Sequence, residues 1–390
     1  MSSEPDAPDE SLSEIYQKID TVLAPDTQKS FKPWHKPRKH YLRIYQWCKQ
    51  FRSLIKELGY RDGDEASYFG LPGADFLDVR TLDGVCGRAK ISVNYLGFDS
   101  TTDLVSDYEL NLSKHEVFSL GYVSKFSVLA KDRVEKIADP ASPARALFEK
   151  RAPFDVVNLD LCDSVIDAGG FGSYFAMIKS ICDLQLSGGR TRPWLLFLAT
   201  RIIRSQVERE STGKLIECIQ NNANANVAFA EAIKKLGLSE STLQAEAVCK
   251  SALDDSGFVS MLALGFAKWL LCLSTSEHPK MGVKLLDSFM YRVDGSHPDM
   301  LSLAFRMEPV IPARRDASGL APSTLEPPAV DELSLALDLV ASVSRLVDLD
   351  DFMRSNEKVR SKMVDKCGSL LATARYDKAG YEKWVENVER

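Results

Sequence analysis

Short apolar runs recur along the first half of the chain, and most of them end at or beside a carboxylate. A first run lies at 76–79, a second ends at Asp99, and a third ends near Asp132. Two more lie at 154–161 and 194–198, and helix-length segments separate the runs. Buried strands that alternate with helices are typical of a parallel sheet, which binds ligands at the carboxyl ends of its strands. The pattern therefore predicts an α/β, Rossmann-like domain with a nucleotide-shaped pocket.

The later pattern predicts an antiparallel addition to this sheet. Two β-like segments, 288–293 and 300–307, flank a turn-forming stretch at 294–298 and are typical of a hairpin. We expect the chain to be organised as an acidic, partly disordered lead-in with a short helix (1–28), a basic amphipathic helix (29–60), a Rossmann-like domain (61–310) with a helical insertion at about 208–285, a Pro-rich linker (309–329) and C-terminal helices (330–390).

Composition narrows the class of protein without identifying a chemistry. The 390 residues are 45% hydrophobic and 27% charged, with a net charge of −6, so any nucleic-acid contact needs a local basic face. The eight cysteines form no C-x-x-C pair, which favours reduced thiols over a metal or disulfide cluster. The chain opens on acidic and polar residues, and its longest apolar run, 258–273, contains Lys268. We therefore expect a cytoplasmic protein with no membrane contact.

The most unusual charge feature is the segment 29–56, which carries nine lysines and arginines and no acid. Aromatic residues are interleaved with these cations, and apolar positions recur at helical spacing after Pro37. Unpaired cations bind phosphates and exposed aromatic rings stack on bases, so the segment predicts contact with nucleic acid. An acidic protein partner is the second possibility, and an ordinary helix with its aromatic face in the core is the third. The candidate nucleic-acid-binding residues are Lys36, Arg38, Lys39 and Arg43.

The order of five parallel-type strands followed by a late hairpin resembles class I S-adenosylmethionine-dependent methyltransferases. The resemblance covers about residues 70–310, if a helical insertion is allowed. The basic segment at 34–41, together with 154–163 in the fourth-strand position, is also similar to three-Cys-motif partner proteins, a bacterial methyltransferase-like family. This second similarity implies a place in a bacterial multi-protein system, such as a mobile-element or phage-defence cassette.

The methyltransferase resemblance implies a role for each of five polar residues. Asp78 would stand at the end of the first strand, Asp99 would bind the ribose hydroxyls, and Asp132 would contact the adenine amino group of S-adenosylmethionine. Asn158 and Asp160, on the same face of the fourth strand, would meet the substrate and are the candidate catalytic residues. These two would need a third partner to hold a metal ion, so no metal is expected.

The sequence also departs from the methyltransferase pattern, and the departures favour a protein that does not catalyse methyl transfer. After the predicted first strand the first glycine is Gly84, six residues beyond Asp78, and Arg80 would stand where the backbone should approach the cofactor. The fourth strand also lacks the Asn/Asp-Pro-Pro-aromatic motif. We therefore expect a methyltransferase-shaped pseudoenzyme that binds nucleic acid or a partner protein, with a nucleic-acid methyltransferase as the alternative.

Overall fold

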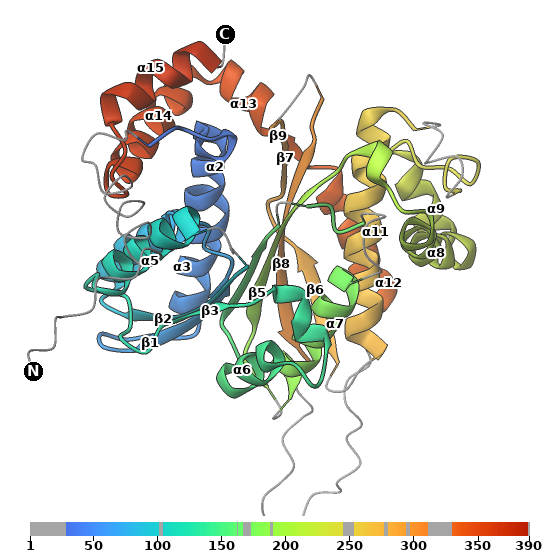
Figure 1. Ribbon diagram of the computed structural model, residues 1–390. Helices are drawn as coiled ribbons and strands as arrows, with labels where there is room; N and C mark the ends of the chain where they lie inside the picture. Colours follow the sequence, from blue (N-terminus) through green and yellow to red (C-terminus); the bar gives the residue numbers. More distant parts are fainter. Residues whose placement is uncertain are drawn as a thin grey trace, which may run out of the picture.

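The computed structural model describes residues 29–100, 104–161, 163–166, 173–187, 190–244, 253–276, 280–293, 297–310 and 330–388. It confirms the predicted α/β, Rossmann-like architecture (Figure 1). The predicted lead-in and nearly all of the predicted linker lie outside these ranges.

Within the described residues a single mostly parallel sheet has nine strands in the order β3-β2-β1-β4-β5-β8-β7-β9, and β6 also pairs with β8. The strands are β1 Glu65–Gly70, β2 Ser92–Asp99, β3 Val128–Lys131, β4 Val156–Asp160, β5 Trp194–Arg201, β6 Met281–Leu285, β7 Phe289–Tyr291, β8 Met300–Pro309 and β9 Val347–Asp348. The first five strands are parallel to one another, whereas β8 is antiparallel to β5, β6 and β7. The predicted hairpin is therefore confirmed as β7 and β8.

Helices surround both faces and one end of the sheet. In the first half they are η1 Pro33–His35, α2 Pro37–Leu42, the π-helical η2 Arg43–Trp47, α3 Cys48–Glu57, α4 Leu77–Ala89, α5 Leu104–Phe118, η3 Val134–Ala138, α6 Pro143–Arg151 and α7 Ser173–Leu186. In the second half they are η4 Arg204–Gln206, α8 Arg209–Ala225, α9 Val227–Lys234, α11 Asp255–Ser276, α12 Glu332–Val343, α13 Leu349–Ser355, α14 Glu357–Ala372 and α15 Lys378–Val388.

The first strand of the sheet lies earlier in the chain than the apolar pattern predicts, and the predicted segment at 76–79 is the start of a helix. Phe76 precedes a helix and has a left-handed backbone with a φ of 51°, and the segment from Leu77 onward is α4. Its apolar residues at Leu82 and Val85 continue a helical spacing that a four-residue run cannot distinguish from a buried strand. The strand that fills this position in the sheet is β1, Glu65–Gly70.

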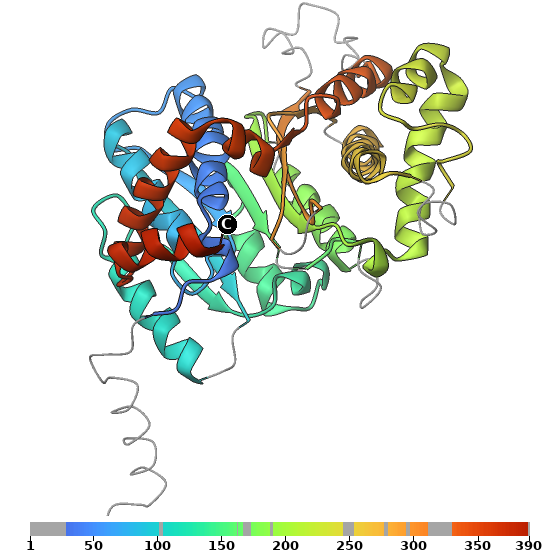
Figure 2. The ribbon, with the colours of Figure 1, turned by 90° about the horizontal axis from the view of Figure 1, so that it is seen from above.

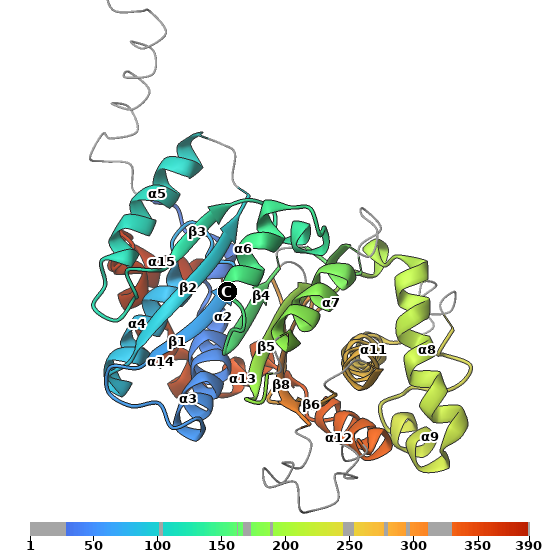
Figure 3. The same ribbon diagram turned by 90° about the horizontal axis from the view of Figure 1, so that it is seen from below.

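Both faces of the sheet are buried, so its central strands carry continuous apolar runs. In β5, Leu195 and Phe197 face the side covered by α3 and α4, whereas Leu196 and Leu198 face the opposite side. Figure 3 shows α3 and α4 on one side of the strands and α6 and α7 on the other. Because helices cover both faces of the sheet, the ends of its strands are held in place. Side chains at those ends therefore have defined positions.

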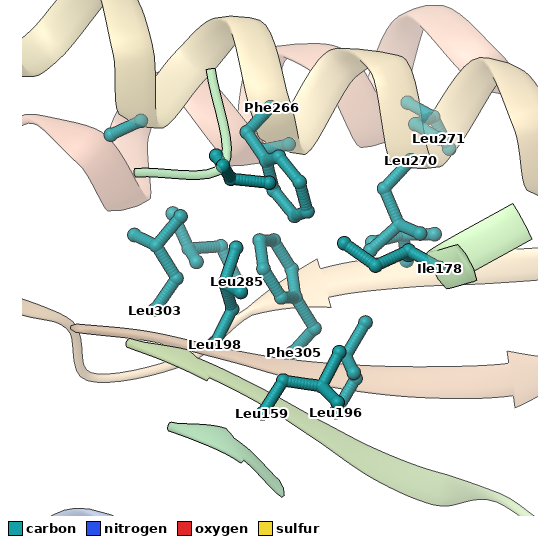
Figure 4. Close-up of a cluster of buried hydrophobic side chains, with 14 of the residues drawn as sticks. Leu159, Ile178, Leu196, Leu198, Phe266, Leu270, Leu271, Leu285, Leu303 and Phe305 are labelled. Carbon is teal, nitrogen blue, oxygen red and sulfur yellow. The ribbon is translucent and has the colours of Figure 1, made fainter. Parts of the chain in front are cut away.

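The long helix α11 is the centre of the larger core. Figure 4 shows its Phe266 and Leu270 packed over side chains from β5 and β8. By length and composition this helix could cross a membrane, but 72% of its most apolar window is buried inside the protein. Its fully buried Lys268 forms an ion pair with Glu332 at the start of α12. The pattern is that of a core helix.

The C-terminal segment contacts both the helices around α11 and the N-terminal helix α2. α12 packs against α11 and β6, β9 then adds a parallel edge to the sheet beside β7, and α14 packs against α2. Figure 2 shows the red C-terminal helices lying next to the blue N-terminal helix. The segment after residue 330 is therefore integrated into the same fold as the sheet.

Candidate functional site

Four predicted acids gather at the carboxyl edge of the sheet. Asp99 is the last residue of β2, Asp160 is the last residue of β4, and Asp132 directly follows β3. Because these strands are parallel, their carboxyl ends share one edge. Asp78 reaches this edge differently from the prediction, since it lies in the first turn of α4 and not at the end of a strand.

The loop between β1 and α4 carries glycines, and it precedes Asp78 in the chain. Gly70 ends β1, and Gly73 has a positive φ of 59°, which favours glycine. Arg80 is part of α4 and donates hydrogen bonds to the carbonyls of Asp75 and Thr373. Its predicted position at the closest approach of the backbone to a cofactor is therefore wrong, because residues 77–89 form a helix and the loop after the first strand lies at 71–76.

Asp160 is held by a lysine from the N-terminal helix. The Lys39 Nζ atom on α2 lies 2.5 Å from Asp160 Oδ1, 5.0 Å from the centroid of the Trp47 ring and 3.4 Å from the Tyr291 hydroxyl. Burial alone would lower the pKa of Lys39, but Asp160 and Tyr291 together outweigh burial, so the pKa is raised. Lys39 is therefore charged, and its charge is neutralised within the site.

Asp78 is held by the next cation along the same segment. The Arg43 Nε atom, in the π-helical turn η2, lies 2.6 Å from Asp78 Oδ1. Burial raises the pKa of Asp78 and Arg43 opposes that rise, while the nearby negative charge of Asp160 adds to it. The two ion pairs therefore form one buried charge cluster, which we call the carboxyl-edge cluster: Lys39, Arg43, Asp78 and Asp160.

The cations predicted to bind nucleic acid are mostly inside the protein. Arg38, Lys39 and Arg43 are only 8%, 5% and 4% exposed. Arg38 forms an ion pair with Asp350 of α13, and Lys36, which is half-buried, donates to the carbonyl of Val293. In this structure the three buried side chains present no basic surface. They could reach a phosphate only by leaving a carboxylate unpaired in the interior, which is costly.

Several buried polar atoms beside this cluster have no hydrogen-bond partner among the described residues. Asn158, which is 1% exposed, donates from Nδ2 to the Tyr68 hydroxyl at 3.0 Å, but its Oδ1 is unpaired. The His40 Nδ1, Arg43 Nη1 and Trp47 Nε1 atoms are unpaired as well. These four groups are the ones that could hold a small polar ligand, because buried polar atoms otherwise cost free energy.

The remaining two predicted cofactor acids lie outside the carboxyl-edge cluster. Asp132 accepts a hydrogen bond from its neighbour Arg133 N and pairs with Lys136 at 2.7 Å, and the Lys136 bond lowers its pKa. This pattern is typical of an acid at the start of a helical turn. Asp99 stays half-buried at the end of β2. The structure thus brings Asp78 and Asp160 together and leaves Asp132 in local contacts.

Asp75, the acid of the β1–α4 loop, contacts both the first described residues and the C-terminal helices. Asp75 accepts hydrogen bonds from Lys29 Nζ at 2.9 Å and from the Tyr376 hydroxyl at 2.8 Å, and His35 Nε2 lies 3.6 Å away. Burial raises the pKa of Asp75, but the nearby His35 and Lys29 side chains lower it by more, so the net shift is downward. Sequence analysis missed Asp75, because it assigned the preceding residues to no strand.

The C-terminal helices close over this loop. The backbone carbonyl of His35 accepts hydrogen bonds from the Tyr381 hydroxyl at 2.8 Å and from the Cys367 thiol. Arg375 forms ion pairs with Glu109 and Glu116 of α5. The region above the carboxyl edge is therefore covered by the first and last helices of the described residues (Figures 1 and 2).

In its described form the edge offers a packed charge network. Asp160, the candidate catalytic carboxylate, would have to exchange Lys39 for a substrate before it could act as a base. Among the described residues no group of three His, Cys, Asp or Glu side chains is arranged to hold a metal ion. In this arrangement the charged side chains stabilise the fold, and none of them is free to transfer a proton.

Comparisons with known proteins place the chain in a family. The chain belongs to the PP_RS20740-like family, whose family model matches residues 28–386. A comparison with curated proteins finds no match. The matched region includes both the N-terminal segment and the C-terminal helices that cover the carboxyl edge.

Proposed function

We propose that this protein is a methyltransferase-shaped binding module, a pseudoenzyme in which the position of a nucleotide cofactor is taken by the chain's own side chains. Its partner is nucleic acid or another protein of a bacterial multi-protein system. The system is suggested by the resemblance to three-Cys-motif partner proteins alone.

The strand order supports the methyltransferase part of the proposal. β8 is inserted antiparallel between β5 and β7, after five parallel strands ordered β3-β2-β1-β4-β5. This matches the chain order by which the sequence resembles class I methyltransferases. One fold can have many functions, so the activity must be inferred from the residues of the site.

One observation carries the binding-module part. At the carboxyl edge, where such a fold places its ligand, Asp160 and Asp78 are ion-paired with Lys39 and Arg43. A cofactor entering there would have to separate two buried ion pairs. Each broken pair leaves a charge in the interior and costs about 3–5 kcal/mol, which is a large fraction of the roughly 8 kcal/mol of a micromolar complex.

A second candidate is an S-adenosylmethionine-dependent methyltransferase that acts on nucleic acid. The observation in its favour is the β1–α4 loop, where Gly70 and Gly73 stand where the fold needs small residues near a cofactor. The unpaired polar atom Oδ1 of Asn158, beside that loop, is a further polar group available to a ligand. In this alternative, segment 29–47 moves away before the cofactor binds.

Isothermal titration calorimetry of the full chain with S-adenosylmethionine separates the two candidates. S-adenosylhomocysteine and ATP serve as comparators. We expect no measurable heat from any of the three. Binding in the micromolar range that is lost in Asp99→Ala would overturn the proposal in favour of the enzyme. Asp183→Ala, which removes an acid of α7 whose side chain is 38% exposed, is the matched control and should behave like the wild type in either case.

A further inference from the structure

The basic segment has a second half that is arranged quite differently from its buried first half. Arg52 and Lys56 lie four residues apart on α3, and both are exposed. They line an open hollow of about 420 Å³ between α3 and α4, which lie side by side in Figure 3. We call this site the basic hollow; its lining residues are Arg52, Ile55, Lys56, Tyr60, Val85, Arg88, Ala89 and Ile91.

The basic hollow lies at the opposite edge of the sheet from the carboxyl-edge cluster. Tyr60 precedes β1 and Ile91 immediately precedes β2, so both stand at the amino ends of strands. Arg88 comes from the last turn of α4. A ligand in this hollow would therefore leave the ion pairs of Lys39 and Arg43 intact.

The charged residues that line the hollow are all cations. None of its lining residues is acidic, and Arg52, Lys56 and Arg88 form no ion pair with a carboxylate in the described part of the chain. By contrast, Lys49 on the same helix pairs with Asp287 at 2.6 Å. Cations near the C-terminus of a helix also stabilise the helix itself through its dipole. That role does not require the cations of two helices to surround a common hollow.

An aromatic ring and an apolar floor accompany these cations. The Tyr60 hydroxyl donates to Asp155 Oδ2 at 2.7 Å, which fixes the ring. The Arg192 guanidinium lies 5.2 Å from the centroid of that ring and adds a further cation beside the hollow. Ile55, Val85 and Ile91 lie at the bottom of the hollow and belong to the core, with only 5%, 2% and 1% of their surfaces exposed. The volume falls within the roughly 300–1,000 Å³ of small-ligand sites.

We propose that the basic hollow binds single-stranded nucleic acid, with its cations on consecutive phosphates and its tyrosine ring against an unstacked base. Phosphates need unpaired cations, and a base needs an apolar or aromatic surface to replace its stacking. A duplex would offer the phosphates alone, because its bases stay stacked. This inference rests on the binding-module function proposed above and names its partner.

Fluorescence anisotropy with a labelled 20-nucleotide single strand tests the inference on the full chain. The test variant is Arg52→Glu/Lys56→Glu/Arg88→Glu. The control is Lys358→Glu/Lys362→Glu/Lys366→Glu, which makes the same change of charge on exposed positions of α14. Circular dichroism melts confirm that both variants fold. We expect the test variant to bind at least about tenfold more weakly, with a salt dependence of log K reduced by about 2 for three lost phosphate contacts.

Three outcomes would overturn the inference. They are absence of binding by the wild type, equal losses in the test and control variants, and equal affinity for a duplex of the same length. Competition by poly-glutamate as strong as that by the oligonucleotide would instead identify an acidic protein partner, and competition by free ATP alone would identify a mononucleotide site.

The result is separable from that of the calorimetric test. Silence toward S-adenosylmethionine together with absent oligonucleotide binding would leave the pseudoenzyme proposal standing and remove only its nucleic-acid partner. Binding of S-adenosylmethionine, together with weaker oligonucleotide binding by the test variant, would overturn the pseudoenzyme proposal and support the nucleic-acid partner. The two sites lie at opposite edges of the sheet, so neither measurement disturbs the other.

Discussion

Lys39 and Asp160 are 121 positions apart in the sequence, yet the Lys39 ammonium nitrogen lies 2.5 Å from a carboxylate oxygen of Asp160. The lysine comes from the first described α-helix and the acid from the end of a central strand. Both side chains are largely buried, with 6% and 19% of their surfaces exposed. The N-terminal segment therefore reaches the part of the sheet where a nucleotide-binding fold usually holds its ligand.

Removing one partner of this pair should destabilise the protein. Lys39→Met keeps most of the side-chain volume but leaves Asp160 without its counter-charge, so we expect a loss of about 3–5 kcal/mol in the free energy of unfolding. Lys39→Met/Asp160→Asn removes both charges and should recover part of that loss. Urea unfolding of the wild type, both single variants and the double variant measures the coupling.

A coupling free energy near zero would contradict a buried ion pair at this position. The exposed pair of Lys179 and Asp183 on α7 is the matched control, since the exposed fractions of these side chains are 49% and 38%. Its coupling should be about 0.3–0.5 kcal/mol, as is usual for exposed pairs one helical turn apart.

His40 should make the stability of the protein depend on pH. Burial, with the nearby positive charges of Arg43 and Lys366, lowers the pKa of His40 from 6.5 to about 3. Below pH 6.5 the unfolded chain binds a proton that the folded chain does not, so stability is complete above pH 6.5 and declines as the pH falls. The decline due to this residue should approach about 1.4 kcal/mol per pH unit.

Unfolding free energies of the wild type and His40→Gln between pH 7 and pH 4.5 measure this contribution. The variant should show a shallower loss of stability on acidification. Parallel curves for the two proteins would mean that His40 is solvated or already protonated in the folded state. His115→Gln, on the polar surface of α5, is a suitable control.

Two glycines in helices should respond in opposite directions to replacement by alanine. At Gly265 of α11 an added Cβ would lie 2.9 Å from the Leu215 Cβ of α8, so Gly265→Ala should destabilise by about 1–3 kcal/mol. At Gly84 of α4 the nearest atom is the end of the Arg88 side chain at 3.9 Å. Gly84→Ala should therefore stabilise by about 0.5–1 kcal/mol through helix propensity.

Thermal and urea unfolding of both variants check this pair. The Gly84 variant controls for the intrinsic preference of alanine in a helix, and the difference between the two variants isolates the close packing of α8 on α11. Stabilisation by both substitutions would show that α8 can move away from α11 at little cost.

Most of the sheet was predictable because its strands have local signatures. β2, β4 and β5 are compact apolar runs that end near polar residues, and the hairpin of β7 and β8 has turn-forming residues between two apolar stretches. β1 was missed because Glu65 and Ser67 dilute its apolar pattern. The Pro72-Gly73 turn behind it was the available signal, and it would have located the glycine loop as well.

The candidate site was only half predictable. Asp160 and Asn158 could be placed from the end of one strand, since a strand fixes which residues share a face. Asp75 and its contacts with Lys29 and Tyr376 could not, because those partners are 46 and 301 positions away along the chain. Such contacts depend on how separate elements pack together.

The basic segment shows most clearly what the sequence determines and what only the tertiary structure determines. Its sequence determined that 29–56 is rich in cations, lacks acids and follows a helical pattern, and that the sheet behind it is of the Rossmann-like kind. Only the tertiary structure decided that Arg38, Lys39 and Arg43 point to buried carboxylates while Arg52 and Lys56 face an open hollow. The physical reason is that charge is a property of a residue. Whether that charge is neutralised depends on which distant acids the fold brings within a few ångströms.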